Sequence, residues 1–402
     1  MGAPRDHFRA GLASVDITPD PDRQHVELSG YVAREQPAMG VRDRLQATVL
    51  AIGGARGGDP TAIVALDLCI LSADACARIA QASPLPDDHV LLVCSHTHSA
   101  PATYPLIGCG DPDPAYERRL AVLVGDAIRR AVMAMVPVRV GWGRRAVDSP
   151  LWGNRRDPAG PSDPRVQLLK IERSDSAREP VCAVWSLPCH PVTFGADHRR
   201  VSADWVGEVR RALPWPSLFL QGFAGDQNPL ARGEDACAAF AGLAPHLSSL
   251  WDSTLTAAAG PFGWARKTVA LPRLSGDALP TTPRAGSRAA AAMDRWGESV
   301  ARPGEVVPPS TVTAVAWRAH NGRTVFWPGE PHLALAQTLP PDVLAVGHTG
   351  PSVGYIAERT AYDRPGYEVG EAHRYYGFAS ALAPEAGEAL VDASASLLAE
   401  LG

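Results

Sequence analysis

Short apolar runs recur along this chain, and each one ends at polar, glycine or proline residues. Runs of this length and composition predict buried β-strands, because a strand that is covered on both faces has few polar positions. The predicted strands lie at 47–52, 61–68, 90–94, 138–142, 166–171, 181–187, 217–220, 311–317 and 324–327.

Between these runs, other segments place their apolar residues at helical spacing. Residues 73–82 form one such segment, and Asp113 and Pro114 supply an N-cap and a first-turn residue for a helix to about residue 135. The amphipathic pattern of 381–401 predicts a terminal packing helix. Helices interspersed among strands in this order predict an α/β fold, with a mixed β-sheet core sandwiched by helices.

Residues 274–309 differ in composition from the rest of the chain, since they are rich in Pro, Gly, Ser, Thr and Ala. An interdomain linker is one interpretation. We favour an irregular excursion with a short helix at 289–296, because strands of the same core are predicted to follow it. Residues 1–402 are therefore expected to form a single domain.

Composition narrows the class of protein. The 402 residues are 46% hydrophobic and 20% charged, which is typical of a soluble globular protein. The net charge is −5 and no basic patch stands out, so nucleic acid is not an expected partner. Neither a secretion signal nor an apolar run of membrane-spanning length is apparent. Seven cysteines without a CxxC pair indicate free thiols and a cytoplasmic location, and the high Ala, Gly, Pro and Arg content suggests a bacterial source.

The first candidate site residues follow the predicted strand at 90–94. His96 and His98 follow it in the sequence SHTHSAP. On a strand, residues two positions apart face the same side, so both imidazoles could reach one site. Neutral imidazole is the commonest protein ligand of zinc, whereas a pair of hydrogen-bonded structural histidines is the simpler alternative.

Three other strand ends carry polar residues of ligand-binding types. His190 follows the strand at 181–187 between two prolines, which restrict the direction of the chain. Asp226 and Asn228 lie in the turn GDQNP after the strand at 217–220, where an Asx-type turn is the alternative interpretation. Glu330 follows the strand at 324–327 and would suit as a carboxylate ligand of a divalent cation.

A tyrosine-rich segment that contains Tyr355 and Tyr367 completes the candidates. Most tyrosines are core residues with a satisfied hydroxyl. A phenol beside a cation can instead bind the ion or donate a hydrogen bond to an oxyanion.

The order of these motifs resembles that of the neutral/alkaline (non-lysosomal) ceramidase family and its bacterial relatives. The resemblance covers most of the chain. It rests on residues 11–19, on the SHTHSAP, CHPVTFG, GDQNP and PGEP motifs, on the pair Asn154-Arg155 and on residues 354–368. It implies the fold of the family's catalytic domain.

The resemblance also implies the roles of particular residues. It implies one Zn²⁺ ion with four protein ligands, namely His96, His190, Glu330 and Tyr355. His98 resembles the residue that handles substrate or protons in the family. Arg155 and Tyr367 resemble residues that line the site and stabilise the oxygen of the substrate.

The chain departs from the family at one position. Family members carry a serine with an assigned catalytic role in a G-D-x-S-P turn, whereas Asn228 stands at that place here. Because asparagine is no nucleophile, a mechanism with serine as the attacking group does not carry over. The sequence is also expected to lack the family's C-terminal β-sandwich domain, which argues against long-chain ceramide as the substrate.

Together these residues predict a zinc-dependent hydrolase of the amide bond in a small or lipid-like N-acyl compound. Zinc lowers the pKa of bound water to about 7 and so supplies hydroxide at neutral pH. His98 or Asp226 would take the proton, and Arg155 and Tyr367 would stabilise the oxyanion. A zinc-dependent ester, lactone or other acyl hydrolase is the closest alternative, and a non-catalytic metal-binding homologue is a more distant one.

Overall fold

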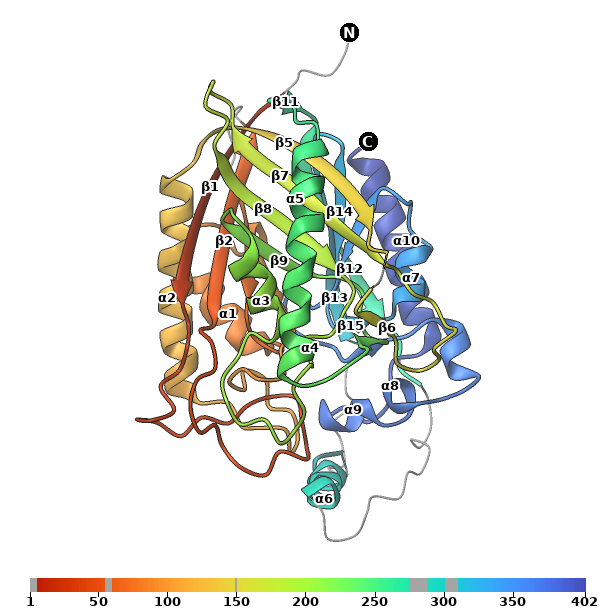
Figure 1. Cartoon of the computed structure of the whole chain (residues 1–402). Helices are drawn as coiled ribbons and strands as arrows, with labels where there is room; N and C mark the ends of the chain where they lie inside the picture. Colours follow the sequence, from red (N-terminus) through yellow and green to blue (C-terminus); the bar gives the residue numbers. More distant parts are fainter. Residues whose placement is uncertain (1–5, 55–59, 149, 275–287, 301–309) are drawn as a thin grey trace.

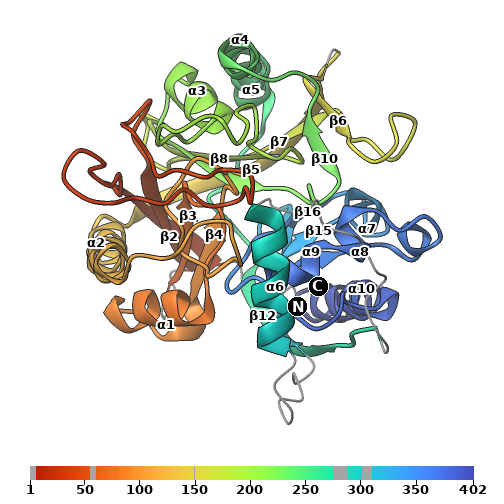
Figure 2. The same cartoon turned by 90° about the horizontal axis from the view of Figure 1, so that it is seen from below.

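Two β-sheets lie face to face in the computed structural model of the chain, and helices cover their outer faces (Figures 1 and 2). The structure describes residues 6–54, 60–148, 150–274, 288–300 and 310–402. Within these residues the layers follow one another as helices, large sheet, small sheet and helix. The predicted α/β class, with a mixed β core between helices, is confirmed.

The large sheet is built from nine strands of the described chain. They are β1 Asp6–Asp16, β2 Gln46–Gly54, β3 Thr61–Leu66, β4 Val90–Cys94, β5 Val136–Ala146, β7 Arg165–Arg173, β8 Pro180–Leu187, β9 Ser217–Gln221 and β11 Ala259–Gly260. Their order is β4-β3-β2-β1-β5-β7-β8-β9, with β11 beside β1. The pairs β3–β4 and β8–β9 are parallel, and the other pairs are antiparallel.

The small sheet has the order β12-β13-β14-β16. Its strands are β12 Phe262–Leu271, β13 Ser310–Ala319, β14 Gly322–Phe326 and β16 Val343–Val346. Only the pair β14–β16 is parallel within it. Two short ladders lie beyond the sheets: β6 Trp152–Asn154 with β10 Gln227–Pro229, and β15 Glu330–Pro331 with β17 Tyr355–Ile356.

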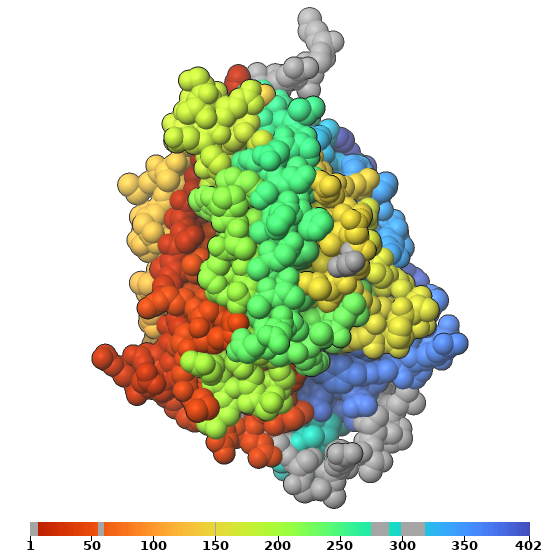
Figure 3. Space-filling view, viewed as in Figure 1, coloured from red at the N-terminus to blue at the C-terminus, as the bar shows by residue number. Residues whose placement is uncertain are grey.

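Helices cover both outer faces. On the large sheet lie α1 Ala73–Ala82, α2 Pro114–Met133, α3 Trp205–Ala212, α4 Glu234–Ala239 and α5 Ala244–Ser253. On the small sheet lie α7 Leu333–Gln337 and α10 Pro384–Glu400. Three more helices lie near the lower end of Figure 1: α6 Arg288–Val300, α8 Tyr367–Gly370 and α9 Ala372–Tyr375. In the space-filling view α5 runs down the middle of the front face (Figure 3).

Alternation along the strands explains why the layers stack in this order. In β2, Val49 and Ala51 pack against α1 and α2, whereas Leu50 and Ile52 point to the opposite face. There they join one apolar cluster with Phe326 of the small sheet. Because both faces of the central strands are covered, their sequences are almost continuously apolar. The shared cluster between the sheets makes the two halves of the chain depend on each other.

Several elements match the sequence-based expectations, and others were missed. The helix predicted to start after Asp113 is α2, in which the Asp113 carboxylate accepts a hydrogen bond from the backbone N–H of Ala115. The short helix predicted at 289–296 lies within α6. The rest of the proposed excursion, residues 275–287 and 301–309, falls outside the described residues. The sequence analysis missed β1 and β12, and it did not foresee a second sheet.

The fold gathers several strand ends at one place. The carboxamide nitrogen of Gln221, at the end of β9, donates to the carbonyls of Ser95 after β4 and Cys189 after β8, at 3.0 and 2.8 Å. The backbone N–H of Gly347, after β16, donates to the carbonyl of Gln221 at 3.0 Å. Loops from both sheets therefore meet around the end of β9.

Two sequence-based expectations concern the whole chain. All seven cysteines lie among the described residues and are free thiols, as expected. In the part of the chain that the structure describes, no helix combines the length and the apolar composition needed to cross a membrane.

Candidate metal centre

His96 lies in the loop that leaves β4 and not on the strand itself. The strand ends at Cys94, and His96 has a φ of 71°, which breaks the extended conformation. Its backbone N–H donates to the carbonyl of Leu68 at 2.9 Å, so the loop is anchored to the end of β3. The expectation that strand alternation aligns His96 with His98 is therefore wrong, and a turn of the loop brings them together instead.

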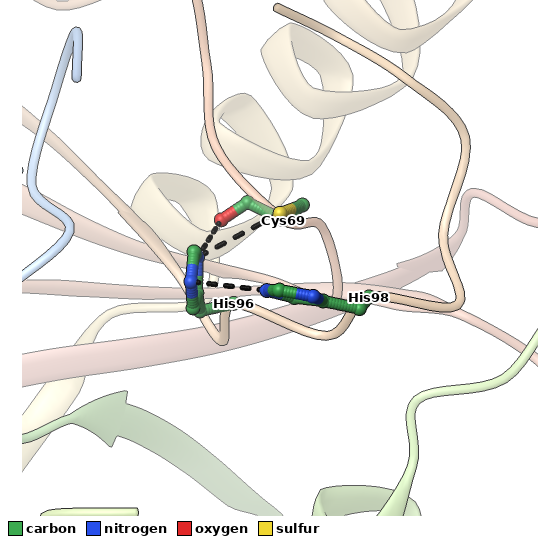
Figure 4. A group of neighbouring side chains, drawn as sticks. All are labelled: Cys69, His96 and His98. Carbon is green, nitrogen blue, oxygen red and sulfur yellow. Dashed lines mark hydrogen bonds between the residues drawn. The ribbon is translucent and has the colours of Figure 1, made fainter. Parts of the chain in front are cut away.

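The imidazole of His96 has one nitrogen fixed and one directed into the site. Its Nδ1 lies 2.9 Å from the carbonyl oxygen of Cys69, as Figure 4 shows. A carbonyl oxygen can only accept, so Nδ1 carries the proton and donates it. Burial alone would lower the pKa of His96, but Glu330 raises it well above its usual value, so Nε2 also carries a proton, and a metal ion that displaced this proton would take the Nε2 lone pair. Metal-binding histidines commonly have this arrangement, in which the distal N–H is held by a backbone carbonyl.

His190, which follows β8, repeats this arrangement. Its Nδ1 donates to the carbonyl of Gln227 at 3.0 Å, and its backbone N–H donates to the same carbonyl. The indole N–H of Trp205 donates to the carbonyl of His190 at 3.0 Å. These three bonds fix the imidazole, so its Nε2 also faces inward. The side chain is fully buried.

Glu330 lies between the two histidines. Its Oε2 is 3.1 Å from Nε2 of His96 and 3.2 Å from Nε2 of His190, and its Oε1 accepts a hydrogen bond from the phenol of Tyr376. Burial alone would raise the pKa of Glu330, but the two imidazoles hold it well below its usual value. Glu330 is therefore a buried carboxylate anion, which is a natural ligand for a cation.

His98 also reaches this cluster. Its Nε2 lies 3.2 Å from Nε2 of His96 (Figure 4). Its ring packs edge-on against Tyr31. Gly30, with a φ of +97°, leaves room for the ring, because a Cβ at that position would lie 2.4 Å from Cγ of His98. Burial and the neighbouring His96 and His190 lower the pKa of His98 well below its usual value. His98 is thus neutral at pH 7.

Arg155 and Tyr355 form a hydrogen-bonded pair beside Glu330. Tyr355 is the partner of Glu330 in the β15–β17 ladder. The Arg155 guanidinium donates to the phenol oxygen of Tyr355 at 3.1 Å and to Oε1 of Glu368 at 2.9 Å. The ring of Tyr367 lies 5.8 Å from that of Tyr355, edge to face. Four of the predicted site residues are therefore neighbours, namely Arg155, Glu330, Tyr355 and Tyr367.

Asp226 and Asn228 have different surroundings. Both carboxylate oxygens of Asp226 accept hydrogen bonds, one from the backbone N–H of Leu333 and one from the side chain of Asn154, at 2.9 and 2.7 Å. Asp226 thus ties three loops of the site together. In the described structure, the buried Oδ1 of Asn228 has no hydrogen-bond partner.

A cavity of about 970 Å³ opens beside these residues. Both Asp226 and Asn228 line it, as do Arg155 and Tyr367. Its other lining residues are Asn154, Arg156, Asp157, Gly160, Pro161, Glu358, Thr360, Ala361, Asp363, Arg364, Gly366 and Glu368. Among the described residues, this lining includes carboxylate, guanidinium and carboxamide side chains, but no leucine, isoleucine, valine, methionine or phenylalanine. A cavity with such walls suits a hydrophilic ligand.

The sequence analysis missed two residues of the cluster. Tyr376 lies just after α9 and was not distinguished from the other tyrosines of the C-terminal region. His348 follows the strand β16 in the sequence GHTG, and its ring stacks on that of His96 at 4.1 Å. The signal for His348 was a histidine two residues after a short apolar run, which is the kind of position that singled out His96 and His190. It was overlooked because the short apolar run at 343–346 was not identified as a strand.

The residues present fit a zinc ion. Two sets of side chains place their ligand atoms within 4.8 Å of one another: Cys69, His96 and His98, and His96, Glu330 and His348. Imidazole nitrogens with a carboxylate oxygen are donors that zinc accepts. The carboxylate is anionic, and two of the imidazoles have their distal N–H groups held by carbonyls. These features favour a cation-binding site over a cluster of hydrogen-bonded structural side chains.

Comparisons with known proteins show which solved structures share this fold. No protein-family model matches this chain, and neither does any curated protein sequence. The structure is similar to the crystal structure of neutral ceramidase from Pseudomonas aeruginosa, with a TM-score of 0.76 and 17% identity over 98% of this chain and 75% of that chain. It is also similar to the structure of a ceramidase complexed with C2, with a TM-score of 0.76 and 16% identity over 98% and 76% of the two chains.

The fold of the protein is therefore neutral-ceramidase-like. The similarity extends over nearly all of this chain, so it includes both sheets and the loops that meet at the end of β9. At these identities the comparison establishes the arrangement of the chain, and the chemistry has to be argued from the residues of the site.

Proposed function

We propose that this protein is a zinc-dependent hydrolase that cleaves the amide bond of an N-acyl compound. The observation that carries the proposal is the convergence of His96, His190 and Glu330, each oriented by a separate hydrogen bond. These residues would hold the ion, with Tyr355 beside them. The similarity of the fold to two ceramidase structures supports an amide as the bond that is cleaved.

A bound zinc ion would polarise the substrate carbonyl and lower the pKa of a water molecule. His98 is neutral and faces the same cluster, so it is positioned to accept the proton from that water and to return it to the leaving amine. Arg155 carries a permanent positive charge beside the cavity and is positioned to stabilise the oxygen that becomes negative in the transition state.

Water is the attacking group in this proposal because the turn after β9 has no serine. Asn228 lines the cavity at the position of the serine in the resembling family, and its Oδ1 is free of hydrogen bonds in the described structure. Asn228 would therefore line the pocket of the substrate without taking part in the attack. Asp226 uses both carboxylate oxygens to hold loops, so we assign it a positioning role.

We propose that the site residues contributed by the two sheets act as one catalytic unit. The site takes His96 and His190 from loops of the large sheet and Glu330 from the short strand β15, which follows β14 of the small sheet. The two sheets share one apolar cluster, so neither half would keep its part of the site alone.

Substitution of the histidines tests the proposal. His96→Ala and His190→Ala should each lose bound zinc, measured by elemental analysis, and turnover of a panel of N-acyl compounds. The control is His25→Ala, because the side chain of His25 is 67% exposed and lies outside the cluster. A His190→Ala protein that is active without zinc would contradict the proposal.

The substrate bond is tested separately with matched pairs. Each amide in the panel is compared with the ester that has the same acyl group, and kcat/KM is measured for both. Because esters are intrinsically more reactive than amides, cleavage of the esters with no turnover of any matched amide would favour the acyl-ester alternative. A wild-type protein that holds zinc and cleaves neither series would favour a non-catalytic metal-binding protein.

A further inference from the structure

His348 is a buried histidine whose ring nitrogens are both without hydrogen-bond partners in the described structure. Only 3% of its surface is exposed. A buried polar group that makes no hydrogen bond costs about 1–3 kcal/mol, so such a group calls for an explanation. No role described above for the other site residues uses this imidazole.

The position of the ring supplies the explanation. The ring of His348 stacks on that of His96, with centroids 4.1 Å apart and planes 30° apart. Its centroid lies 6.4 Å from that of His190, with the planes almost perpendicular. A nitrogen of His348, a nitrogen of His96 and an oxygen of Glu330 all lie within 4.8 Å of one another. His348 therefore faces the same point in space as the proposed zinc ligands.

The backbone holds His348 in an uncommon conformation. Its φ of 51° lies in the left-handed region, which is unfavourable for a residue other than glycine. Its N–H donates to the carbonyl of Gly329 at 2.9 Å, and its carbonyl accepts from the N–H of Cys94 at 3.1 Å. One partner lies next to Glu330 and the other at the end of β4. The loop is thus fastened to the two segments that carry Glu330 and His96.

We infer that His348 is a further ligand of the metal ion, so that three imidazoles and one carboxylate surround it. This inference rests on the proposed function, because it concerns the same ion. An ion would accept the lone pair of the buried ring nitrogen and so remove the cost of leaving it without a partner. A nitrogen-rich donor set of this kind suits zinc, cobalt and other transition metals better than magnesium or calcium.

His348 should be a weaker ligand than His96 or His190. In those two residues a backbone carbonyl fixes the tautomer, and such outer bonds typically contribute about 10–100-fold to metal affinity. His348 has no such bond in the described structure, so its nitrogen is less strongly oriented. We therefore expect loss of His348 to weaken binding without abolishing it.

The test uses His348→Phe, which keeps an aromatic ring stacked on His96 but removes both nitrogens. Metal-free protein is titrated with Zn²⁺ against a chelator of known affinity, and the visible spectrum of the Co²⁺-loaded protein is recorded. We expect zinc affinity to fall by at least about tenfold and the Co²⁺ absorption bands to shift, as loss of one nitrogen ligand requires. Neither measurement depends on enzymatic activity.

His373→Phe is the matched control. His373 is also buried, with both ring nitrogens unpartnered in the described structure, but it packs near Trp296 and outside the cluster. This variant should keep the wild-type zinc affinity and Co²⁺ spectrum. A second test variant, His348→Asn, serves if the larger phenylalanine prevents folding, because asparagine tolerates the left-handed conformation.

The possible outcomes separate this inference from the proposed function. Wild-type zinc affinity and an unchanged Co²⁺ spectrum in His348→Phe would overturn the inference. If His190→Ala loses the metal in the same experiments, the proposed function stands while the role of His348 does not. A wild-type protein that binds neither Zn²⁺ nor Co²⁺ would overturn both.

Discussion

The phenol of Tyr376 donates a hydrogen bond to Oε1 of Glu330, and Oε2 of the same carboxylate faces His96 and His190. The phenol therefore fixes the orientation of the carboxylate without occupying the oxygen that points at the imidazoles. A hydrogen bond of this kind to a metal ligand raises affinity by orienting the ligand before the ion arrives.

Replacing this phenol should weaken metal binding. Tyr376→Phe removes the donor to Glu330, and we expect zinc affinity to fall by about 10–100-fold. The measurement is a competitive titration of metal-free protein. Tyr104→Phe is the control, because the hydroxyl of this neighbouring tyrosine donates to the backbone carbonyl of Tyr376 at 3.3 Å and not to a ligand. Equal affinities in the two variants would remove Tyr376 from the support of the site.

Gly30→Ala should displace His98. The new Cβ would lie 2.4 Å from the imidazole, so the ring must shift from its present place beside His96. Activity should fall toward the loss of about 10²–10⁴-fold that is typical for removal of a general base, while zinc remains bound. Gly233→Ala is matched to this variant, since Gly233 has the same φ of +97° with nothing within 4 Å of its Cβ. Both variants should lose stability, about 1 kcal/mol or more, but only Gly30→Ala should lose activity.

Arg155→Met should slow hydrolysis without releasing zinc. Loss of one oxyanion donor typically costs about 10²–10³ in rate, and none of the proposed imidazole ligands depends on Arg155. Arg155→Lys should be intermediate, because lysine keeps the charge but cannot contact Tyr355 and Glu368 with the same planar group. The measurements are kcat/KM and zinc content. An unchanged kcat/KM in zinc-loaded Arg155→Met protein would exclude Arg155 from the mechanism.

Trp205→Phe should destabilise the protein more than Trp185→Phe. Both rings belong to the same buried cluster, so the two substitutions remove similar apolar surface. Trp205 also donates to the carbonyl of His190, whereas the N–H of Trp185 has no partner in the described structure. The difference in free energy of unfolding should be about 1 kcal/mol, measured by urea denaturation of metal-free protein. A larger loss for Trp185→Phe would contradict this account.

Stability should fall when the pH is lowered from about 6.5 to about 4, and His373 should contribute to the fall. Burial, together with the charge of Arg374, lowers the pKa of His373 to about 4 from an ordinary value of 6.5. Between these values the unfolded chain binds a proton that the folded protein does not, so acid favours unfolding. The full shift corresponds to about 3 kcal/mol.

The variant His373→Phe isolates this contribution. Its free energy of unfolding should depend less on pH than that of the wild-type protein between pH 7 and pH 4. Below pH 4 the two pH dependences should become parallel, because His373 is then protonated in both states. Identical pH dependences throughout would show that His373 titrates normally in the folded protein.

The sequence could indicate candidate site residues because titratable side chains stand where apolar runs end. His96, His190 and Glu330 each follow such a run, and the structure brings both imidazoles within hydrogen-bond distance of the same carboxylate oxygen of Glu330. Local sequence shows where a strand ends, since turn-forming residues are needed there. It does not show which strand ends meet, so the grouping of these residues came from a resemblance and not from the pattern itself.

Errors arose where local sequence gives little information. His96 and His98 were expected to align by strand alternation, although a positive φ at His96 had already turned the chain. Asp226 was one of two candidate proton acceptors, and the sequence did not show that Leu333 and Asn154, distant in sequence, donate hydrogen bonds to its two oxygens. The hydrogen bonds of a side chain depend on neighbours that only the folded chain supplies.

By itself the sequence determined the apolar strands, the helices between them and the residue types available at their ends, because these follow from the local spacing of apolar and turn-forming residues. Only the tertiary structure decided that two sheets stack face to face and that His348 and Tyr376 join His96 and Glu330. These decisions depend on which distant apolar faces bury each other, and packing of that kind is a property of the whole chain.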